Sequence, residues 1–183
     1  MRYPGFSPVL IWLRKRLIDR RYEDICPFLF VFSRDFSYLC DRSNYYLNRS
    51  MGRKEEYKLQ NEQFMQALCA EADVCELPCG ILYKVLEEGS GTATPRSGSV
   101  VSVHYRGTLI NGREFDNSWK RNCPEAFRLS EVIEGWQIAL QKMRVGDRWI
   151  IYIPYTMGYG TRTSGPIPAF STLVFEVQLL GIA

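Results

Sequence analysis

The stretch EVIEGW, residues 131–136, opens the one convincing helix in the C-terminal two thirds of the chain. Ala139, Leu140 and Met143 follow Trp136 at helical spacing, which predicts one buried face with the indole on its first turn. A glycine directly before the tryptophan leaves space where another group can approach closely. On this pattern alone Trp136 is either an ordinary core residue or part of a binding surface.

The segments around this helix carry the patterns of β-strands. Residues 81–86 are a strand candidate, and residues 101–106 alternate apolar with polar side chains, as a half-buried strand does. The Asn-Gly pair at 111–112 predicts a tight turn into a strand at 113–116. Two further strands are expected at residues 149–153 and 173–179. The sequence therefore predicts an α+β fold, a mostly antiparallel sheet with one helix on its concave face.

A second helix is expected before the sheet, over residues 51–72. Its apolar stripe is narrow and is interrupted by Asn61; it consists of Tyr57, Phe64, Met65 and Leu68. Such a helix packs on the body, extends as a tail or pairs with another subunit, and the sequence does not rank these alternatives. Pro and Gly at 78–80 end the helical pattern. We therefore divide the chain into a segment at 1–50, a helix and linker at 51–79 and a domain at 80–183.

Residues 1–50 differ in kind from the rest. They hold 11 of the 25 aromatic residues but show no sustained periodicity. Their apolar runs, at 8–13 and 27–32, are shorter than the roughly 20 residues of a membrane span. Basic residues follow the first run, and no Ala-x-Ala-like site appears, so no secretory signal is predicted and a cytoplasmic location is expected. We favour an over-extended translation start, with the working protein beginning at Met51, over a genuine extension that docks through its aromatics or lies on a membrane surface.

Composition narrows the classes of function. The chain has 183 residues, of which 46% are hydrophobic, enough for one domain with an appended segment. Residues 51–183 carry 14 Lys and Arg against 15 Asp and Glu, which argues against nucleic acid as a partner. Six cysteines without a CxxC pair, and a single histidine, do not predict a metal site, and no cofactor is expected. The cysteines are expected to be free thiols in a reducing compartment.

Aromatic residues from separate elements form the strongest candidate for a site. Each lies at a strand end, a helix start or a glycine-flanked loop, and they are Tyr105, Phe115, Trp136, Tyr159 and Phe175. They line one cavity or belong to the general core, and physical reasoning leaves the two about even. The glycines on both sides of Tyr159 favour a loop that contacts a ligand.

Five motifs then carry a resemblance to a known family. They are VHYRG (103–107), GREFDNS (112–118), VIEGW (132–136), GYG (158–160) and STLVFEV (171–177). Their order and spacing resemble those of FKBP-type peptidyl-prolyl cis-trans isomerases of the bacterial single-domain type, over about residues 80–183. The resemblance implies a five- or six-stranded antiparallel sheet wrapped around one short helix, with the active pocket between them.

The resemblance also implies roles for individual residues. Trp136 would be the pocket floor, and Asp116 the main polar wall residue, although pairing with Arg121 or a turn amide is an equally open role for it. The other walls would be Tyr105, Phe115, Val132, Ile133, Tyr159 and Phe175, with Ile167 over the rim. Many members place an aromatic directly after the motif's proline, whereas here Glu125 and Ala126 come first, so Phe127 is expected to take over that wall. We assign Asp116, Tyr159 and Phe115 to catalysis and the remaining residues to substrate binding.

The implied activity is rotation about Xaa-Pro bonds in proline-containing peptides and in unfolded or folding proteins. Such a reaction needs no covalent chemistry, because the barrier of about 18–20 kcal/mol comes from amide resonance. Macrolide inhibitors are candidate ligands of the same pocket. The alternative from another class is a module that binds a prolyl segment or partner protein without turnover.

Overall fold

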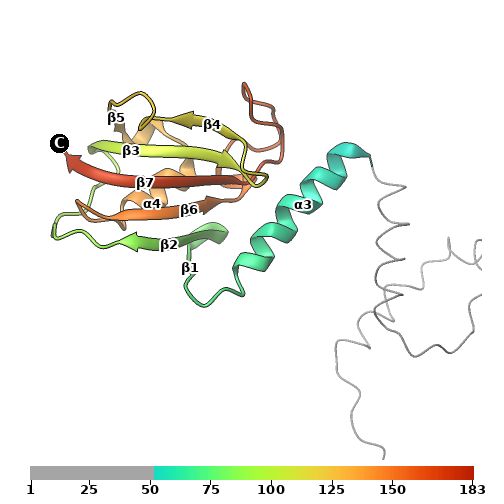
Figure 1. Ribbon diagram of the computed structural model, residues 1–183, viewed down its shortest axis with the longest axis horizontal. Coiled ribbons are helices and arrows are strands. Elements are labelled where there is room, and N and C mark those ends of the chain that lie inside the picture. The colour runs from blue at the N-terminus through green and yellow to red at the C-terminus, as the bar shows by residue number, and fades with distance from the viewer. Residues whose placement is uncertain (1–51) are drawn as a thin grey trace, which may run out of the picture. The chain divides into compact units, whose positions relative to one another are not determined.

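A seven-stranded antiparallel sheet forms the body of residues 52–183, the part of the chain that the computed structural model describes (Figure 1). Its strands are β1 (Cys75–Leu77), β2 (Ile81–Glu87), β3 (Val100–Leu109), β4 (Glu114–Asn117), β5 (Glu125–Arg128), β6 (Arg148–Ile153) and β7 (Leu173–Ile182). They lie in the order β1-β2-β6-β7-β3-β4, and β5 also pairs with β3. The expectations for residues 1–50, and the start at Met51, lie outside the described residues.

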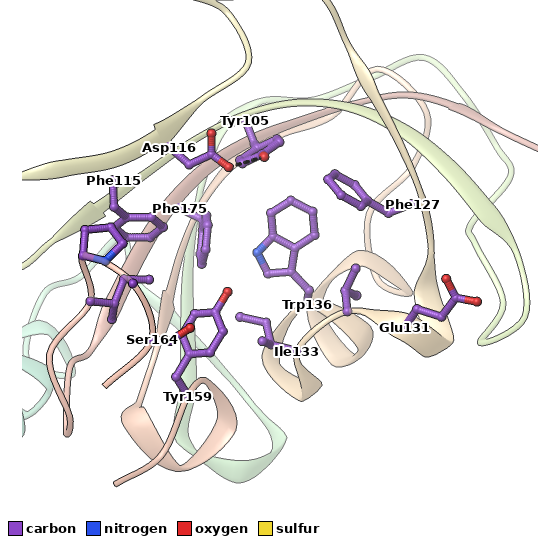
Figure 2. A pocket seen from close by; sticks show the side chains of 14 residues that line it. Tyr105, Phe115, Asp116, Phe127, Glu131, Ile133, Trp136, Tyr159, Ser164 and Phe175 are labelled. Atoms are coloured by element: carbon purple, nitrogen blue, oxygen red, sulfur yellow. Dashed lines mark hydrogen bonds between the residues drawn. The ribbon is translucent and has the colours of Figure 1, made fainter. Parts of the chain in front are cut away.

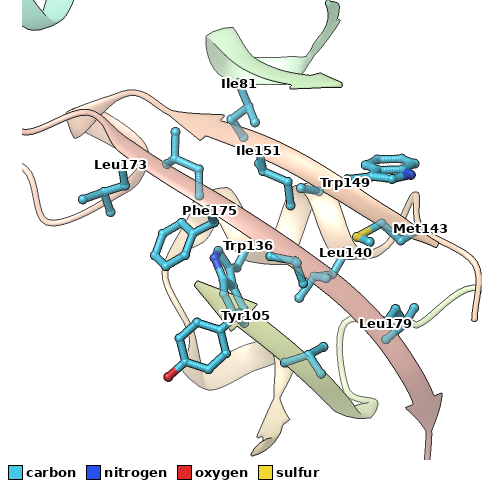
Figure 3. Packing of buried hydrophobic residues seen from close by; sticks show 14 of the residues in the cluster. Ile81, Tyr105, Trp136, Leu140, Met143, Trp149, Ile151, Leu173, Phe175 and Leu179 are labelled. Atoms are coloured by element: carbon cyan, nitrogen blue, oxygen red, sulfur yellow. The ribbon is translucent and has the colours of Figure 1, made fainter. Parts of the chain in front are cut away.

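The predicted helix is α4 (Glu134–Leu140), which packs against one face of the sheet. Strand alternation supplies the other side of this core: Phe175, Val177 and Leu179 of β7 point to the same face, as do Trp149 and Ile151 of β6 (Figure 3). The predicted fold, an antiparallel sheet around one short helix with another helix before it, is confirmed. The short strands β1 and β5 raise the number of strands to seven, and three or four residues are too few to show a period in the sequence.

The predicted hairpin after β3 is present. The N–H of Leu109 donates to the carbonyl of Arg113 at 2.9 Å, and Gly112 has a φ of +78°, which a side chain would disfavour. β4 therefore returns along one end of β3, over residues 106–108, while β5 pairs with the other end of the same edge, over residues 100–103. β4 carries Phe115 and Asp116 and β5 carries Phe127, so this edge of β3 holds three of the candidate site residues.

The N-terminal helix is α3 (Arg53–Leu68), and of the three open alternatives the structure shows packing on the body. Phe64, Met65 and Leu68 lie against Leu82 and Tyr152, whose side chains leave the sheet on the face opposite the main core. Short 3-10 helices occur at Pro78–Gly80, Leu129–Glu131 and Tyr155–Met157. In residues 52–183 no helix has the length and apolar character needed to cross a membrane.

Candidate active site

A cavity of about 520 Å³ lies where α4, the sheet and the loop after β6 meet. All ten residues that the sequence singled out line it: Tyr105, Phe115, Asp116, Phe127, Val132, Ile133, Trp136, Tyr159, Ile167 and Phe175. Figure 2 shows them surrounding one space, with Trp136 at its base. The structure therefore brings the predicted set together, while their catalytic and binding roles stay predictions.

The base of the cavity is a cluster of aromatic rings packed edge to face. The Trp136 ring lies 5.3 Å from Tyr105, 5.6 Å from Phe127 and 5.2 Å from Phe175, with interplanar angles of 79° to 89°. Such arrangements match the positive ring edge to the negative ring face and fix ring orientation. Phe127 thus occupies the wall that Glu125 and Ala126 leave without an aromatic. Trp136 is both core, at 4% exposure, and floor of the cavity.

Two glycines permit this packing. A Cβ on Gly107 of β3 would lie 2.4 Å from the Phe115 ring and 2.9 Å from the Phe175 ring, so only glycine lets both rings close over the strand. A Cβ on Gly135 would lie 2.4 Å from a methyl of Ile153. The group that approaches Gly135 is therefore β6 of the same chain. The close approach expected at this glycine is therefore that of the sheet, and the packing of α4 on β6 uses the space.

Asp116 lies at the centre of a polar network at the cavity edge. The Tyr105 hydroxyl donates to its Oδ2 at 2.5 Å, and Arg121 Nη1 donates to its Oδ1 at 2.5 Å. Both open alternatives for Asp116 are present, since the Asn117 N–H also donates to Oδ1 at 2.8 Å. Arg121 also forms an ion pair with Glu125. Glu125, which stands where many family members have an aromatic residue, is therefore part of this network.

The network decides the charge on these groups. Burial opposes ionisation of Asp116, but the hydrogen bonds from Tyr105 and Arg121 outweigh it and lower the pKa of the carboxyl. Burial, and then the hydrogen bond to the Asp116 carboxylate, raises the pKa of the Tyr105 phenol. Asp116 is therefore an anion and Tyr105 a neutral donor at neutral pH, and neither is poised to transfer a proton.

The opposite side of the cavity comes from the loop between β6 and β7. Tyr159 follows the 3-10 helix Tyr155–Met157, is 41% exposed and directs its hydroxyl into the cavity across from Asp116 (Figure 2). Farther along, Ser164 and Ile167 exchange two backbone hydrogen bonds of 2.9 and 3.0 Å around a tight turn. This turn places Ile167, which is largely buried, against the cavity.

Two donors at the site have no acceptor. The indole Nε1 of Trp136 is buried and makes no hydrogen bond within residues 52–183. The N–H of Ile133, the residue before α4, also finds no acceptor among these residues. Ile133 lines the cavity, so its unpaired N–H is available to a bound carbonyl, whereas the indole Nε1 is buried within the aromatic floor.

Four cavity residues were not predicted: Glu131, Ser164, Gly165 and Pro166. Glu131 is the first residue of the EVIEGW stretch at 131–136, but its place at the end of a 3-10 helix has no periodic signal. Residues 164–166 belong to an irregular loop, where no pattern predicts which side chains face inward. The only indication that these residues line the cavity was that they adjoin Ile167, which the resemblance placed over the rim.

Comparison with known proteins agrees with this geometry. Residues 91–180 match the family described as FKBP-type peptidyl-prolyl cis-trans isomerase. A macrophage infectivity potentiator of Trypanosoma cruzi is 44% identical over 120 residues, covering 65% of this chain and 61% of that protein. An outer membrane protein MIP of Legionella longbeachae is 37% identical over 131 residues, covering 71% of this chain and 56% of that protein. The chain thus spans about three fifths of these relatives.

A crystal structure gives the more complete match. The peptidyl-prolyl cis-trans isomerase from Pseudomonas syringae pv. tomato DC3000 is 36% identical, with a TM-score of 0.67. The alignment covers 73% of this chain and 98% of that chain. The family match at residues 91–180 includes every residue that lines the cavity.

Proposed function

The chain belongs to the family of FKBP-type peptidyl-prolyl cis-trans isomerases, and on this premise we propose that it catalyses rotation about Xaa-Pro bonds in peptides and in unfolded or folding proteins. The observation that carries the proposal is one cavity in which an aromatic floor, the hydroxyl of Tyr159 and the ionised Asp116 face the same space. No proton transfer is required of any of these groups, in keeping with a reaction that makes and breaks no bond.

The chemistry follows from the amide. Planar resonance holds the Xaa-Pro bond, and the uncatalysed rotation takes tens to hundreds of seconds. At the twisted transition state resonance is lost and the carbonyl becomes less dipolar, so an apolar, water-poor cavity stabilises the twisted form relative to the planar one. Trp136 and the rings around it supply that surface to the proline ring.

Hydrogen-bond donors orient the bound peptide. The free N–H of Ile133 and the Tyr159 hydroxyl lie on the α4 and loop sides of the cavity and bind carbonyls next to the proline. Asp116 stays ionised and holds Tyr105 and Arg121 in place, so its contribution is a fixed charge that favours the twisted amide and its environment. Phe115, packed edge to face on Phe175, closes the same wall. Macrolide inhibitors are proposed to occupy this cavity in competition with peptide.

A cytoplasmic location is part of the proposal. Cys69, Cys75, Cys79 and Cys123 are free and exposed, which suits a reducing compartment. One relative is named as an outer membrane protein, so the location needs its own test. Fractionation of cells that express the untagged chain is expected to place it with cytoplasmic markers, and recovery in a membrane or periplasmic fraction would reject this part.

The activity is tested by NMR exchange or a protease-coupled assay on a short Xaa-Pro peptide. The wild type is expected to interconvert the isomers faster than the uncatalysed reaction, and Phe115→Ala is expected to lose most of this rate. A wild-type rate equal to the uncatalysed one, with peptide still bound, would replace the enzyme with the non-catalytic binding module.

A further inference from the structure

A fully buried asparagine links α3 to the chain that enters β7. Asn61 has 0% exposure; its Oδ1 accepts from the Thr172 N–H at 2.7 Å, and its Nδ2 donates to the Tyr57 carbonyl at 2.7 Å. Asparagine is a poor helix former, and a buried amide without partners is costly. The interruption of the apolar stripe is thus a polar attachment point, and Figure 1 shows α3 beside the end of the sheet at which β7 begins.

A second link runs from the same helix one residue earlier in the loop. The hydroxyls of Tyr57 and Ser171 are 2.9 Å apart, and Ser171 Oγ donates to the carbonyl of Pro168 at 2.7 Å. Ser171 donates its single hydroxyl proton to the Pro168 carbonyl. The Tyr57 hydroxyl is therefore the donor in the hydrogen bond between Tyr57 and Ser171. Pro168 directly follows Ile167, which lines the cavity.

A third link joins two lysines of α3 to the base of the same loop. Lys54 Nζ lies 5.2 Å from the centre of the Phe170 ring, and Lys58 Nζ lies 5.7 Å from Phe170 and 5.8 Å from Tyr155. Phe170 has a φ of +64°, a conformation that a bulky residue keeps only when its surroundings hold it. Its N–H donates to the carbonyl of Gly160 at 3.0 Å, next to Tyr159.

These links converge on two of the loop residues that line the cavity, Tyr159 and Ile167. Each is adjacent to a residue, Gly160 or Pro168, that is bonded to the segment held by α3. The remaining aromatic walls stand on strands and on α4 and need no such support. We propose that α3 is the element that sets the loop side of the substrate pocket, with Asn61 and Tyr57 as positioning residues.

The experiment compares Asn61→Ala, which removes the Thr172 link, and Tyr57→Phe, which removes one hydroxyl, with Gln63→Ala on the exposed side of α3. Backbone amide NMR signals of Tyr159 and Ile167 are expected to shift or broaden in the first two variants. The indole signal of Trp136 is expected to stay in place. For a short Xaa-Pro peptide, Asn61→Ala is expected to raise KM about fivefold with a smaller change in kcat, and Tyr57→Phe to change KM by about twofold. Gln63→Ala should match the wild type in every readout.

Because the inference rests on the proposed isomerase function, peptide binding by NMR titration is measured alongside turnover. A wild type without turnover rejects the isomerase, whereas the loop signals and the peptide affinity judge the role of α3 separately. Unchanged signals at Tyr159 and Ile167 in both variants, with unchanged affinity, would overturn the positioning role. If Asn61→Ala fails to fold, Tyr57→Phe decides the matter, since it deletes a single oxygen.

Discussion

The pocket has two sides that are built in different ways. The scaffold wall consists of Tyr105, Phe115, Phe127, Trp136 and Phe175, whose rings interlock on strands and on α4. The loop wall consists of Tyr159 and residues 164–167, which are held by a few hydrogen bonds and are linked through them to residues 170–172, the segment that α3 contacts. We infer that the scaffold wall supplies most of the affinity for the prolyl ring and the loop wall adjusts it.

The largest expected effect is at the scaffold wall. Trp136→Ala is expected to cost about 3–5 kcal/mol of unfolding free energy and to weaken binding of an Xaa-Pro peptide by roughly thirtyfold or more. The buried Met143 gives the matched control: Met143→Ala should cost about 2–5 kcal/mol of stability but leave peptide binding nearly unchanged. Denaturant titration and NMR titration measure the two quantities. Equal losses of binding in both variants would reduce Trp136 to an ordinary core residue.

The next effect tests whether the rings of the scaffold wall need the space over β3. Gly107→Ala inserts a methyl 2.4 Å from the Phe115 ring, and such overpacking is expected to destabilise by about 1–3 kcal/mol and to lower kcat/KM. Phe115→Ala should then cost less activity in the Gly107→Ala background than in the wild type, because the ring is already displaced. Gly98→Ala, which meets no atom within 4 Å, serves as the control. If the activity losses of Gly107→Ala and Phe115→Ala were additive in the double variant, the two substitutions would not act through the same ring.

A smaller effect is expected at the loop wall. Tyr159→Phe removes only a donor and is expected to lower kcat/KM about fivefold, while unfolding free energy changes by less than about 0.5 kcal/mol. Tyr83→Phe is the control, since Tyr83 stacks on Trp149 outside this pocket. If Tyr159→Phe lowered peptide binding and kcat/KM as much as Trp136→Ala does, the proposed difference between the two walls would be rejected.

The smallest effect concerns pH. The pKa of Asp116 lies below its ordinary value near 3.8, so its ion pair contributes fully above that value and the contribution is lost as pH falls through the lower folded value. Because Asp116 stays ionised over this range, activity is expected to be flat between about pH 5 and 8. Rates measured across this range, with Asp116→Asn as the comparison, check it. A bell-shaped profile in the wild type that disappears in Asp116→Asn would assign proton transfer to this carboxyl.

The same contrast explains what the sequence could predict. Strand alternation at 101–106 and 173–179 and the helical spacing after Trp136 predicted Tyr105, Phe175 and Trp136 of the scaffold wall, because periodicity shows which face of an element is buried. The flanking glycines indicated Tyr159 as a loop residue that contacts a ligand, and the resemblance supplied Phe127, Ile167 and the shared cavity. Residues 164–166 were not predicted as cavity residues, because the hydrogen bonds that shape a loop produce no periodic pattern in the sequence. In the sequence Asn61 appeared only as an interruption of the apolar stripe of α3, because its hydrogen-bond partner Thr172 lies 111 residues away.

The position of β7 has a consequence for how this protein is made. β7 lies between β6 and β3 and pairs with both, yet it follows every other strand of the sheet along the chain. During synthesis the two halves of the sheet therefore have no common partner until residues 173–182 leave the ribosome. Sheets closed by such distant pairings form slowly and expose apolar strands meanwhile. A protein proposed to assist the folding of others would then itself pass through an interval in which its apolar strands are exposed.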